Sequence, residues 1–583
     1  MKRRLVATFL MGLSLITGCS RPDRAAGPAS GAGSPPEPGD WIVVRYEGEP
    51  DTLNPIISTN AMASYAQYGA NNSQISEMLL RYNMEDWTFT EPLLAESYPE
   101  ASEDHLVYTF TIREGVKWHD GQPFSAEDVL FSAKAAMSPL VDSAPMRSYF
   151  VELSNVEIVD GRKVRFTFAK PNFQNVWNIG SNLYIVPKHV YDAQGVLDAF
   201  TYKDMIGSKG RTDEKIKAFA DQFNKHAASR APIGTGPYKF EKWETGQEIV
   251  LVRNEDYWGT KPYLDKVLVR IINDYPAALT ALKAGSVDLN PRLTTIQYAQ
   301  QTSGAAFDSQ FAKARYSIPS YYYIGWNLDR PFFKDKRVRQ AMTMLVDRQQ
   351  IIDTVRFGLG KIIAGHFNPN SPDLNPNIQP LPYDPKRAAE LLDEAGWKDS
   401  NGDGIRDKDG VPFRFEFLGQ AASTFVDQLM PIMKEELRKV GIDMVERRLE
   451  FNVLIETIKD HKFDGYSGAW VSGLVSDPFQ LWHSSSIANK GSNYVSFRNP
   501  EADGLLEQAR VEFDAEKRKQ LYWRWQEIIH DEQPYTFLFV PEESAAYDKR
   551  FQGVAWLPPR PGYDLNAWFV PKGSQKYTAA QTP

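Results

Sequence analysis

Few residues in the sequence combine a type and spacing that could support catalysis. His119 and Asp120 are adjacent within the segment Trp118–Gly121, but no nucleophile can be identified beside them. The chain lacks the G-x-S-x-G and H-E-x-x-H motifs of hydrolases, and Gly358–Lys361 does not have the spacing of a phosphate-binding loop. We therefore interpret His119 and Asp120 as parts of a structural turn, and we expect neither enzymatic activity nor a cofactor.

A second group of residues could bind a metal ion. Asp399, Asn401 and Asp403 occupy alternate positions, as the first ligands of an EF-hand calcium loop do. The twelfth position of such a loop supplies a bidentate Glu, and here it is Gly410. A structural turn is therefore the preferred interpretation, and a calcium site remains the alternative. The eight His residues show no ligand-like spacing, so we expect no other metal site.

Cys19 is the only cysteine of the chain, so no disulfide framework competes for its thiol. It follows a charged start, Lys2–Arg4, and an apolar run, Leu5–Thr17, that is too short to span a bilayer comfortably. The segment Ile16–Cys19 resembles the lipobox of bacterial lipoproteins, in which cleavage before the Cys exposes it for acylation. We expect a signal peptide at 1–18 and a membrane anchor at Cys19.

The composition, with 42% hydrophobic and 24% charged residues, is ordinary for a soluble globular protein. Residues 20–40 are rich in Ala, Gly, Pro and Ser, so we expect a flexible tether at 19–40. The chain of 583 residues is too long for one hydrophobic core. Its formal net charge of −8 makes nucleic acid an improbable partner, because phosphates would be repelled.

We expect a monomer that is held at the cell surface or in the periplasm by its lipid anchor.

Hydrophobic periodicity predicts a mixture of strands and helices. An Asp160-Gly161 pair between two apolar runs predicts a hairpin with positive φ at both positions. Gly234-Thr-Gly236-Pro237 predicts a tight turn that needs unusual φ values. Strands are predicted at 41–46, 108–112, 156–159 and 164–168, and helices from Ser125, from Asp384 to Gly396, at 338–346 and at 425–440. The pattern indicates an α/β protein.

Eight segments of the chain form a recognisable series. They are Glu49–Pro55, Tyr108–Ser132, Pro232–Phe240, Arg253–Val267, Leu282–Leu289, Arg330–Met342, Tyr383–Trp397 and Arg498–Arg510. Taken together, they resemble the bacterial extracellular solute-binding proteins of family 5, which are the dipeptide- and oligopeptide-binding components of ABC importers. The similarity extends over about residues 41–560 and follows the order of the family.

The resemblance implies two lobes with a hinge and an additional third domain, an arrangement called class C. Domain I would comprise 41–80, 229–318 and 537–583. The family-specific domain II would be 81–228, and domain III, the second lobe, would be 319–536. Ligand would bind between domain I and domain III, which close over it.

The resemblance also suggests the ligand-binding residues. In peptide-binding members a Trp-led segment pairs with the peptide backbone, and we match it to Trp470, Val471, Ser472 and Gly473. The Asp that usually follows three residues after the Trp is missing, so Asp477 is the best candidate for the ligand's charged or hydroxylated end. Further candidates for ligand contact are Asn60, Met62 and Asn493.

The resemblance leaves the ligand open. An oligopeptide is the first choice, and an oligosaccharide or another solute is the alternative, because Trp470, Trp482 and Tyr321–Tyr323 could also stack on sugar rings. The expected partners are the permease and ATPase subunits of an importer. A periplasmic sensor or chaperone that serves no transporter is the remaining alternative.

Overall fold

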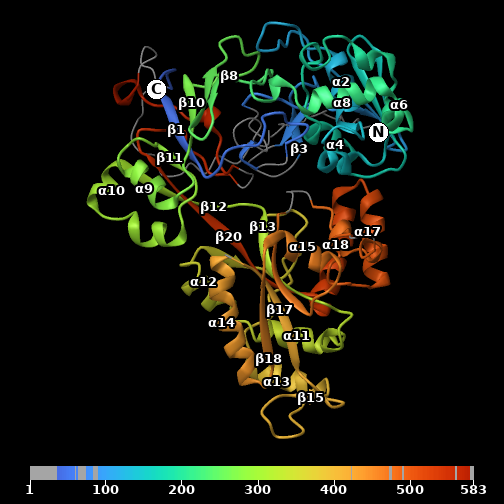
Figure 1. Cartoon of the computed structure of the whole chain (residues 1–583), viewed down its shortest axis with the longest axis vertical. Coiled ribbons are helices and arrows are strands. Elements are labelled where there is room, and N and C mark those ends of the chain that lie inside the picture. The colour runs from blue at the N-terminus through green and yellow to red at the C-terminus, as the bar shows by residue number, and fades with distance from the viewer. Residues whose placement is uncertain are drawn as a thin grey trace, which may run out of the picture.

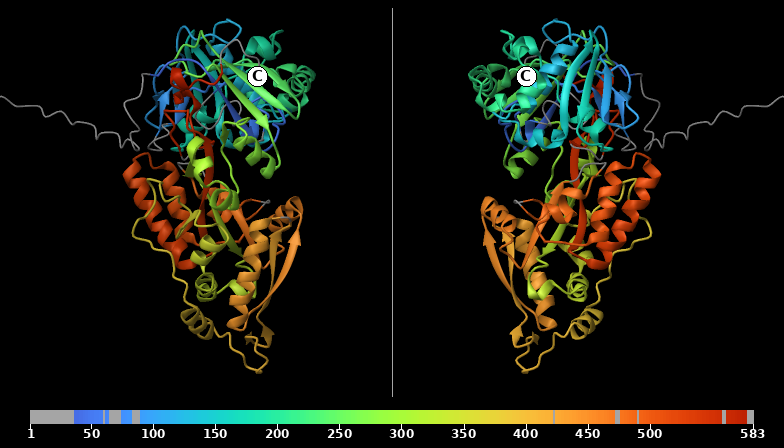
Figure 2. Two further views of the ribbon diagram at one scale, coloured as in Figure 1. Left: turned by 90° about the vertical axis from the view of Figure 1, so that its left-hand side faces the viewer. Right: turned by 90° about the vertical axis from the view of Figure 1, so that its right-hand side faces the viewer.

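Two lobes lie one above the other and are joined by long strands that run between them (Figure 1). The computed structural model describes residues 36–58, 61–63, 74–82, 89–421, 423–471, 476–488, 491–557 and 561–577. A separate side domain is attached to the first lobe, as the two side views also show (Figure 2). The prediction of an α/β, two-lobed fold with an additional domain is confirmed.

The first lobe is built around one half of a mixed sheet. Parallel pairing joins β1 to β10 and to β11, and antiparallel pairing continues from β10 to β9 and β8. Its elements are β1 (Trp41–Tyr46), α1 (Ala61–Ala63), β8 (Tyr238–Glu244), β9 (Glu248–Arg253), β10 (Lys266–Ile271), α9 (Tyr275–Lys283), β11 (Leu289–Asn290), α10 (Ala305–Gln310) and β12 (Phe311–Ser317).

The side domain has its own core around an antiparallel sheet with the order β4-β5-β7-β6. A small hairpin of β2 and β3 precedes this sheet in the sequence. Its elements are β2 (Leu80–Tyr82), β3 (Phe89–Pro92), β4 (Glu100–Ala101), β5 (Val107–Thr111), α2 (Ala126–Met137), α3 (Ala144–Arg147), β6 (Leu153–Asp160), β7 (Lys163–Phe168), α4 (Asn175–Asn182), α5 (Lys188–Tyr191), α6 (Tyr202–Ile206), α7 (Lys209–Thr212) and α8 (Glu214–Asn224).

The second lobe contains the other half of the mixed sheet, in the order β18-β17-β19-β13-β20. Its elements are β13 (Ser320–Trp326), α11 (Lys336–Met344), α12 (Arg348–Thr354), β14 (Gly360–Ile362), α13 (Pro385–Glu394), β15 (Asp407–Lys408), β16 (Val411–Pro412), β17 (Arg414–Gln420), α14 (Thr424–Lys439), β18 (Asp443–Leu449), α15 (Phe451–Lys459), β19 (Gly465–Val471), α16 (Phe479–Trp482), α17 (Pro500–Val511), α18 (Ala515–Glu532) and β20 (Tyr535–Asp548).

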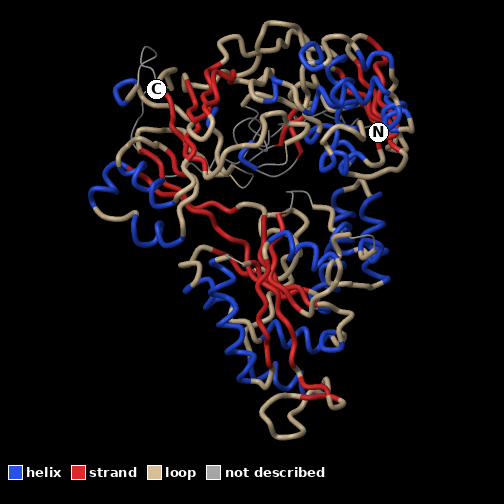
Figure 3. Tube along the Cα trace, in the orientation of Figure 1, coloured by secondary structure: helices blue, strands red, loops and turns tan. Residues whose placement is uncertain are grey.

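Strand β20 belongs to both lobes. From Tyr535 to Pro541 it pairs with β13 and β14 of the second lobe, and from Glu542 to Asp548 it pairs with β12 of the first lobe. The second connection runs from β12 through Ile318 and Pro319 into β13. Figure 3 shows these strands as a continuous path between the lobes.

The predicted helix boundaries agree closely with the structure. The Asp128 carboxylate accepts a hydrogen bond from the Ser125 N–H (2.9 Å) at the start of α2. Asp384 caps α13 by accepting from the Arg387 N–H (2.9 Å). After α14, Gly441 has φ +77°, a conformation that favours glycine.

Two predicted turns form for a different physical reason than the sequence suggested. The hairpin of β6 and β7 is confirmed, but Asp160 and Gly161 are not among the residues with positive φ. Instead the Asp160 carboxylate accepts hydrogen bonds from the N–H groups of Arg162 and Lys163 (both 3.0 Å), which closes the turn. The expectation of positive φ at this hairpin was therefore wrong.

The turn at Gly234 and Gly236 also lacks positive φ, so that expectation was wrong as well. A Cβ at Gly234 would lie 1.8 Å from the carbonyl oxygen of Ile75, and one at Gly236 would lie 2.6 Å from that of Gln74. These glycines are required because two backbones approach closely. His119 fixes the turn, since its Nδ1 accepts from the Gly234 N–H (3.2 Å) and its Nε2 donates to the Gly236 carbonyl (2.9 Å).

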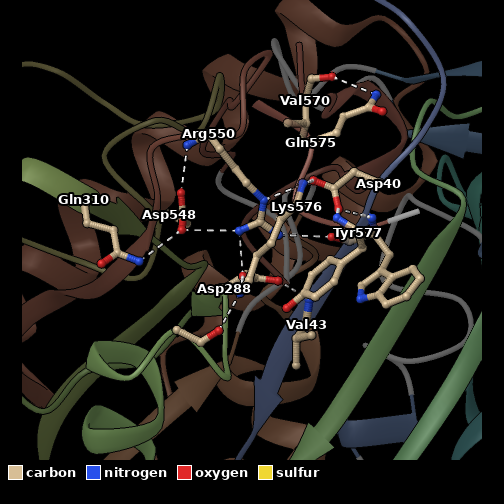
Figure 4. Close-up of polar contacts among 12 residues, drawn as sticks. Asp40, Val43, Asp288, Gln310, Asp548, Arg550, Val570, Gln575, Lys576 and Tyr577 are labelled. Carbon is tan, nitrogen blue, oxygen red and sulfur yellow. Dashed lines mark hydrogen bonds and ion pairs between the residues drawn. The ribbon is translucent and has the colours of Figure 1, made fainter. Parts of the chain in front are cut away.

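A buried ion cluster joins both ends of the folded chain (Figure 4). Arg550 follows β20 and contacts Asp40 (3.2 Å), Asp288 (2.7 Å) and Asp548 (3.3 Å). The Asp40 and Asp288 side chains are 0% exposed. Asp40 also accepts from the Tyr577 N–H (3.1 Å). Asp40, the last residue of the expected tether, therefore belongs to the folded protein.

Replacing Arg550 by Met should destabilise the protein by about 3–5 kcal/mol, because two buried carboxylates would lose their principal cation. The free energy of unfolding in urea measures this loss. Arg387→Met is the matched control, since Arg387 is 41% exposed and its ion pairs with Glu390 and Glu394 are on the surface. The control should change stability by less than about 1 kcal/mol. Equal stability of the two variants would contradict the role given to Arg550.

Candidate functional site

Strand β19 has an unpaired edge at the end of the second lobe nearest the first. It pairs with β13 along its whole length, so that Val471 lies opposite Ser320, the residue directly after the crossing at Pro319. On its other edge β17 pairs only with Gly465 and Tyr466. Among the described residues, no strand pairs with that edge from Ser467 to Val471. The backbone there can accept an additional strand.

Trp470 and Val471, the two described residues of the predicted Trp-led segment, lie on this edge and differ in exposure. Val471 is 60% exposed, which is high for an aliphatic side chain in a strand. Trp470 is half-buried, and its ring stacks on Tyr494 with centroids 5.6 Å apart. Its indole Nε1 donates to the Tyr535 hydroxyl (3.4 Å). The Trp470 ring therefore supports the strand from one face, and the backbone and Val471 remain accessible.

The aromatic layer under β19 is uncharged. Tyr323 stacks on Tyr535 with centroids 4.0 Å apart, and its hydroxyl bonds to that of Tyr466 (2.8 Å). Burial raises the pKa of Tyr535 to about 12, so this hydroxyl stays protonated at neutral pH. The layer supplies a rigid base for the strand rather than a catalytic group.

Polar contacts hold Ser476 and Asp477, where the structure describes the chain again after β19. Ser476 bonds through its hydroxyl to Nε2 of His366 (2.8 Å), and burial lowers the pKa of His366 to about 3. Asp477 accepts from Arg510 Nε (2.6 Å) and from the Phe479 N–H (3.0 Å). The Asp477 side chain is only 9% exposed. Its carboxylate already has a cationic partner within the protein.

The structure describes two of the other predicted site residues, and they lie in different lobes. Met62, on α1, lines a cavity of the first lobe. Asn493 is fully buried, and its amide donates to the carbonyls of Trp482, His483 and Phe497, so it anchors a loop. Asn60, Ser472, Gly473 and Cys19 lie outside the described residues. The ligand-contact roles of Asn60, Met62, Ser472, Gly473 and Asn493 and the lipid attachment at Cys19 stay predictions.

The side chains of the calcium candidates form hydrogen bonds within their own turn. Asp399 accepts from the N–H groups of Gly402 (2.7 Å) and Gly404 (3.0 Å), and Asp403 accepts from that of Ile405 (2.8 Å). Asn401 donates to Asp403 (3.0 Å). Among the described residues, no group of three or more His, Cys, Asp or Glu side chains is arranged to hold a metal ion. These hydrogen bonds are those of a structural turn.

A contact between the side domain and the second lobe could not be predicted from the sequence. The Phe173 N–H donates to the Arg510 carbonyl (2.9 Å), and the Arg518 guanidinium lies 4.2 Å from the Phe173 ring centroid. His105 stacks on Phe513 with centroids 3.6 Å apart. Arg510 thus links the side domain to Asp477 and the loop after β19. Only the fold brings these residues together, since Arg510 is 33 positions from Asp477.

Comparison with known proteins identifies relatives along nearly the whole chain. Residues 90–492 match the sequence profile described as bacterial extracellular solute-binding proteins, family 5, middle region. The oligopeptide-binding protein AppA of Bacillus subtilis is 30% identical over 589 residues, covering 98% of this chain and 100% of AppA. The heme-binding protein A of Haemophilus influenzae is 28% identical, covering 85% of this chain and 87% of that protein.

A solved structure agrees with these sequence matches. AppA from Bacillus subtilis, in complex with a nonapeptide, superimposes with a TM-score of 0.70 at 30% sequence identity. The superposition covers 92% of this chain and 100% of the AppA chain.

The Asp477–Arg510 pair should contribute measurably to stability. We expect Asp477→Asn and Arg510→Met each to cost about 1–2 kcal/mol, because each leaves a largely buried partner unsatisfied. The double variant should cost less than the sum of the two, as expected for directly interacting residues. Urea denaturation of the four proteins measures this coupling.

The exposed pair Asp329–Arg498 is the matched control, with side chains 54% and 52% exposed. The same substitutions there should show a coupling of less than about 1 kcal/mol. Additive losses at Asp477 and Arg510 would contradict a direct role for their ion pair.

Proposed function

Because this chain belongs to the family 5 bacterial extracellular solute-binding proteins, we propose that it is the substrate-binding protein of an ABC importer and that its ligand is a peptide. The unpaired edge of β19 is the observation that carries the choice of ligand. A peptide backbone can pair with that edge, and each hydrogen bond contributes about 0.5–1.5 kcal/mol whatever the peptide sequence. The end-to-end similarity to an oligopeptide-binding protein supports the same choice over heme, the ligand in the name of the second relative.

We propose that binding occurs by hinge closure. Domain I would comprise residues 41–80 and 229–318 together with the C-terminal segment. Domain II would comprise residues 81–228. Domain III, the second lobe, would begin at residue 319. The pairing of β20 supports placing the second crossing at Pro541 and Glu542, a few residues after the boundary expected at 536. A peptide held on β19 would contact the first lobe only when the lobes approach, so ligand would favour the closed state.

Within this site we assign contact with the peptide to Trp470, Val471, Ser472 and Gly473. For Asp477 the contacts favour a positioning role, because an ammonium group would have to displace Arg510 from the carboxylate. Peptides with a free or an acetylated amino terminus should therefore bind with similar affinity. No enzymatic activity is proposed, because His119 and Asp120 are used by the fold: His119 fixes the turn at Gly234, and Asp120 pairs with His189 (2.8 Å).

The protein would act outside the cytoplasm, anchored through lipid on Cys19 and linked to its fold by residues 19–39. Among the residues that the structure describes, no helix is both long and apolar enough to cross a membrane. Permease and ATPase subunits of an importer would be its partners. We propose that it works as a monomer.

Saturating peptide should compact the protein and stabilise it. At a peptide concentration 100 times Kd, mass action adds about 2.7 kcal/mol to the free energy of unfolding. Small-angle scattering should show a smaller radius of gyration with peptide, and thermal denaturation should show a higher Tm. A matched oligosaccharide serves as the control ligand. Binding without any change of scattering would contradict hinge closure, and binding of the oligosaccharide alone would contradict the choice of peptide.

Replacing Cys19 by Ser should release the protein from membranes, because the thioether-linked lipid can no longer form. Fractionation of cells that express each form measures the release. Ser20→Ala is the matched control and should leave the protein attached, since it preserves the thiol. Membrane attachment of Cys19→Ser would contradict the lipid anchor.

A further inference from the structure

Residues 74–80 form a joint between the first lobe and the side domain. Near its start, the Gln74 carbonyl accepts a hydrogen bond from the N–H of Tyr238, the first residue of β8 in the first lobe (2.8 Å). Near its end, the Met78 carbonyl accepts from the N–H of Leu94, which belongs to the core of the side domain (3.1 Å). A change in the middle of this joint therefore acts on the attachment of the side domain.

Glu77 lies in the middle of the joint and is only 1% exposed. The Tyr257 hydroxyl (2.7 Å) and the Trp258 indole Nε1 (3.0 Å) donate to its two carboxyl oxygens. Both of these residues follow β9 in the first lobe. The Glu77 carbonyl, in contrast, accepts from the N–H of Ile185 in the side domain (3.3 Å). Glu77 thus contacts the first lobe through its side chain and the side domain through its backbone.

Trp258 is also held from the side domain. The Arg113 guanidinium lies 4.8 Å from its ring centroid, and Arg113 Nε donates to the Leu93 carbonyl (2.9 Å). The Leu93 N–H in turn donates to the Leu79 carbonyl, which returns the chain of contacts to the joint (2.9 Å). The surroundings of the Glu77 carboxyl and the hydrogen bonds that attach the side domain therefore form one connected set.

Among the described residues, no Lys or Arg forms an ion pair with the Glu77 carboxyl. Arg81 acts on it from a greater distance and is already paired with Glu91 (2.5 Å) at the surface. Burial raises the pKa of Glu77 from its usual 4.5 to about 7, although the hydrogen bonds from Tyr257 and Trp258 lower it. Burial also raises the pKa of Tyr257, so its hydroxyl remains a donor at neutral pH.

A proton on Glu77 would have an acceptor close by. The Thr235 hydroxyl is buried, and its oxygen has no hydrogen bond of good geometry to the described residues. It lies close enough to the Glu77 carboxyl to lower the pKa of that group. The protonated carboxyl can donate to this oxygen and still accept from Tyr257 and Trp258. The ionised carboxylate would instead leave a buried charge without a cation, which is costly.

We propose that Glu77 makes the joint sensitive to pH: a proton on its carboxyl stabilises the contact between the side domain and the first lobe, and loss of this proton weakens that contact. The inference does not rest on the proposed function. For a protein outside the cytoplasm, the joint would respond to the pH of the surroundings.

The direction and size of the effect follow from linkage. When the joint opens, Glu77 becomes hydrated and regains its usual pKa. Because the pKa is raised in the closed joint, the stabilisation is fully present below pH 4.5 and is lost as the pH rises through about 7. The equilibrium constant for opening should therefore increase about 50- to 100-fold from pH 5 to pH 8.

Hydrogen exchange of the full mature chain at pH 5 and pH 8 tests the proposal. After correction for intrinsic exchange rates, protection of the Leu94 and Ile185 N–H groups should fall about 50- to 100-fold as the pH rises. Protection of the N–H groups of β17, in the second lobe, should change by less than about threefold. Equal changes in the joint and in β17 would overturn the proposal. This measurement uses the unsubstituted protein, so it does not depend on the folding of a variant.

Glu77→Gln keeps the shape of the side chain but cannot ionise. Protection at Leu94 and Ile185 should then differ by less than about threefold between the two pH values. Glu103→Gln makes the same change at an exposed residue of the side domain and should keep the response of the unsubstituted protein. A Glu77→Gln protein that retains the full response would show that another group titrates, and it would contradict the assignment to Glu77.

Discussion

The hydrogen bonding of β20 is the constraint on which the other features of this molecule depend. Up to Pro541 this strand pairs with β13 and β14 of the second lobe, and from Glu542 it pairs with β12 of the first lobe. The second connection, from β12 to β13, contains Pro319. Proline has no N–H to donate to a sheet, so Pro319 and Pro541 each leave one backbone donor missing where the lobes meet. The lobes are therefore joined by two neighbouring strand segments, and each segment has a proline at its crossing.

The proposed ligand contact on β19 lies close to these crossings. Val471 pairs with Ser320, the first residue after one crossing, and Ile318, the last before it, lines the cavity of the first lobe. A peptide on the β19 edge would therefore lie beside the crossing strands. The contact of Phe173 with Arg510 adds a connection between the side domain and the second lobe, and through Asp477 it reaches the loop that follows β19.

Local features of this fold could be predicted from the sequence, and distant contacts could not. Capping residues such as Asp384 and the alternation in 164–168 act within a few residues, and the structure has the expected elements there. The Asp40–Arg550 and Asp477–Arg510 pairs join residues that are far apart in the chain, and nothing in their neighbourhoods indicates the partner. The glycines of the Gly234 turn were recognised as special, but the sequence could not show that the reason is the backbone of Ile75.

Above all, we propose that the open edge of β19 binds a peptide backbone. Native mass spectrometry of the protein purified from its own cells, followed by sequencing of whatever is released on unfolding, tests this most directly. We predict a set of peptides of varied sequence, bound one per chain. A single non-peptide compound, such as an oligosaccharide or a metal chelate, bound one per chain would contradict it.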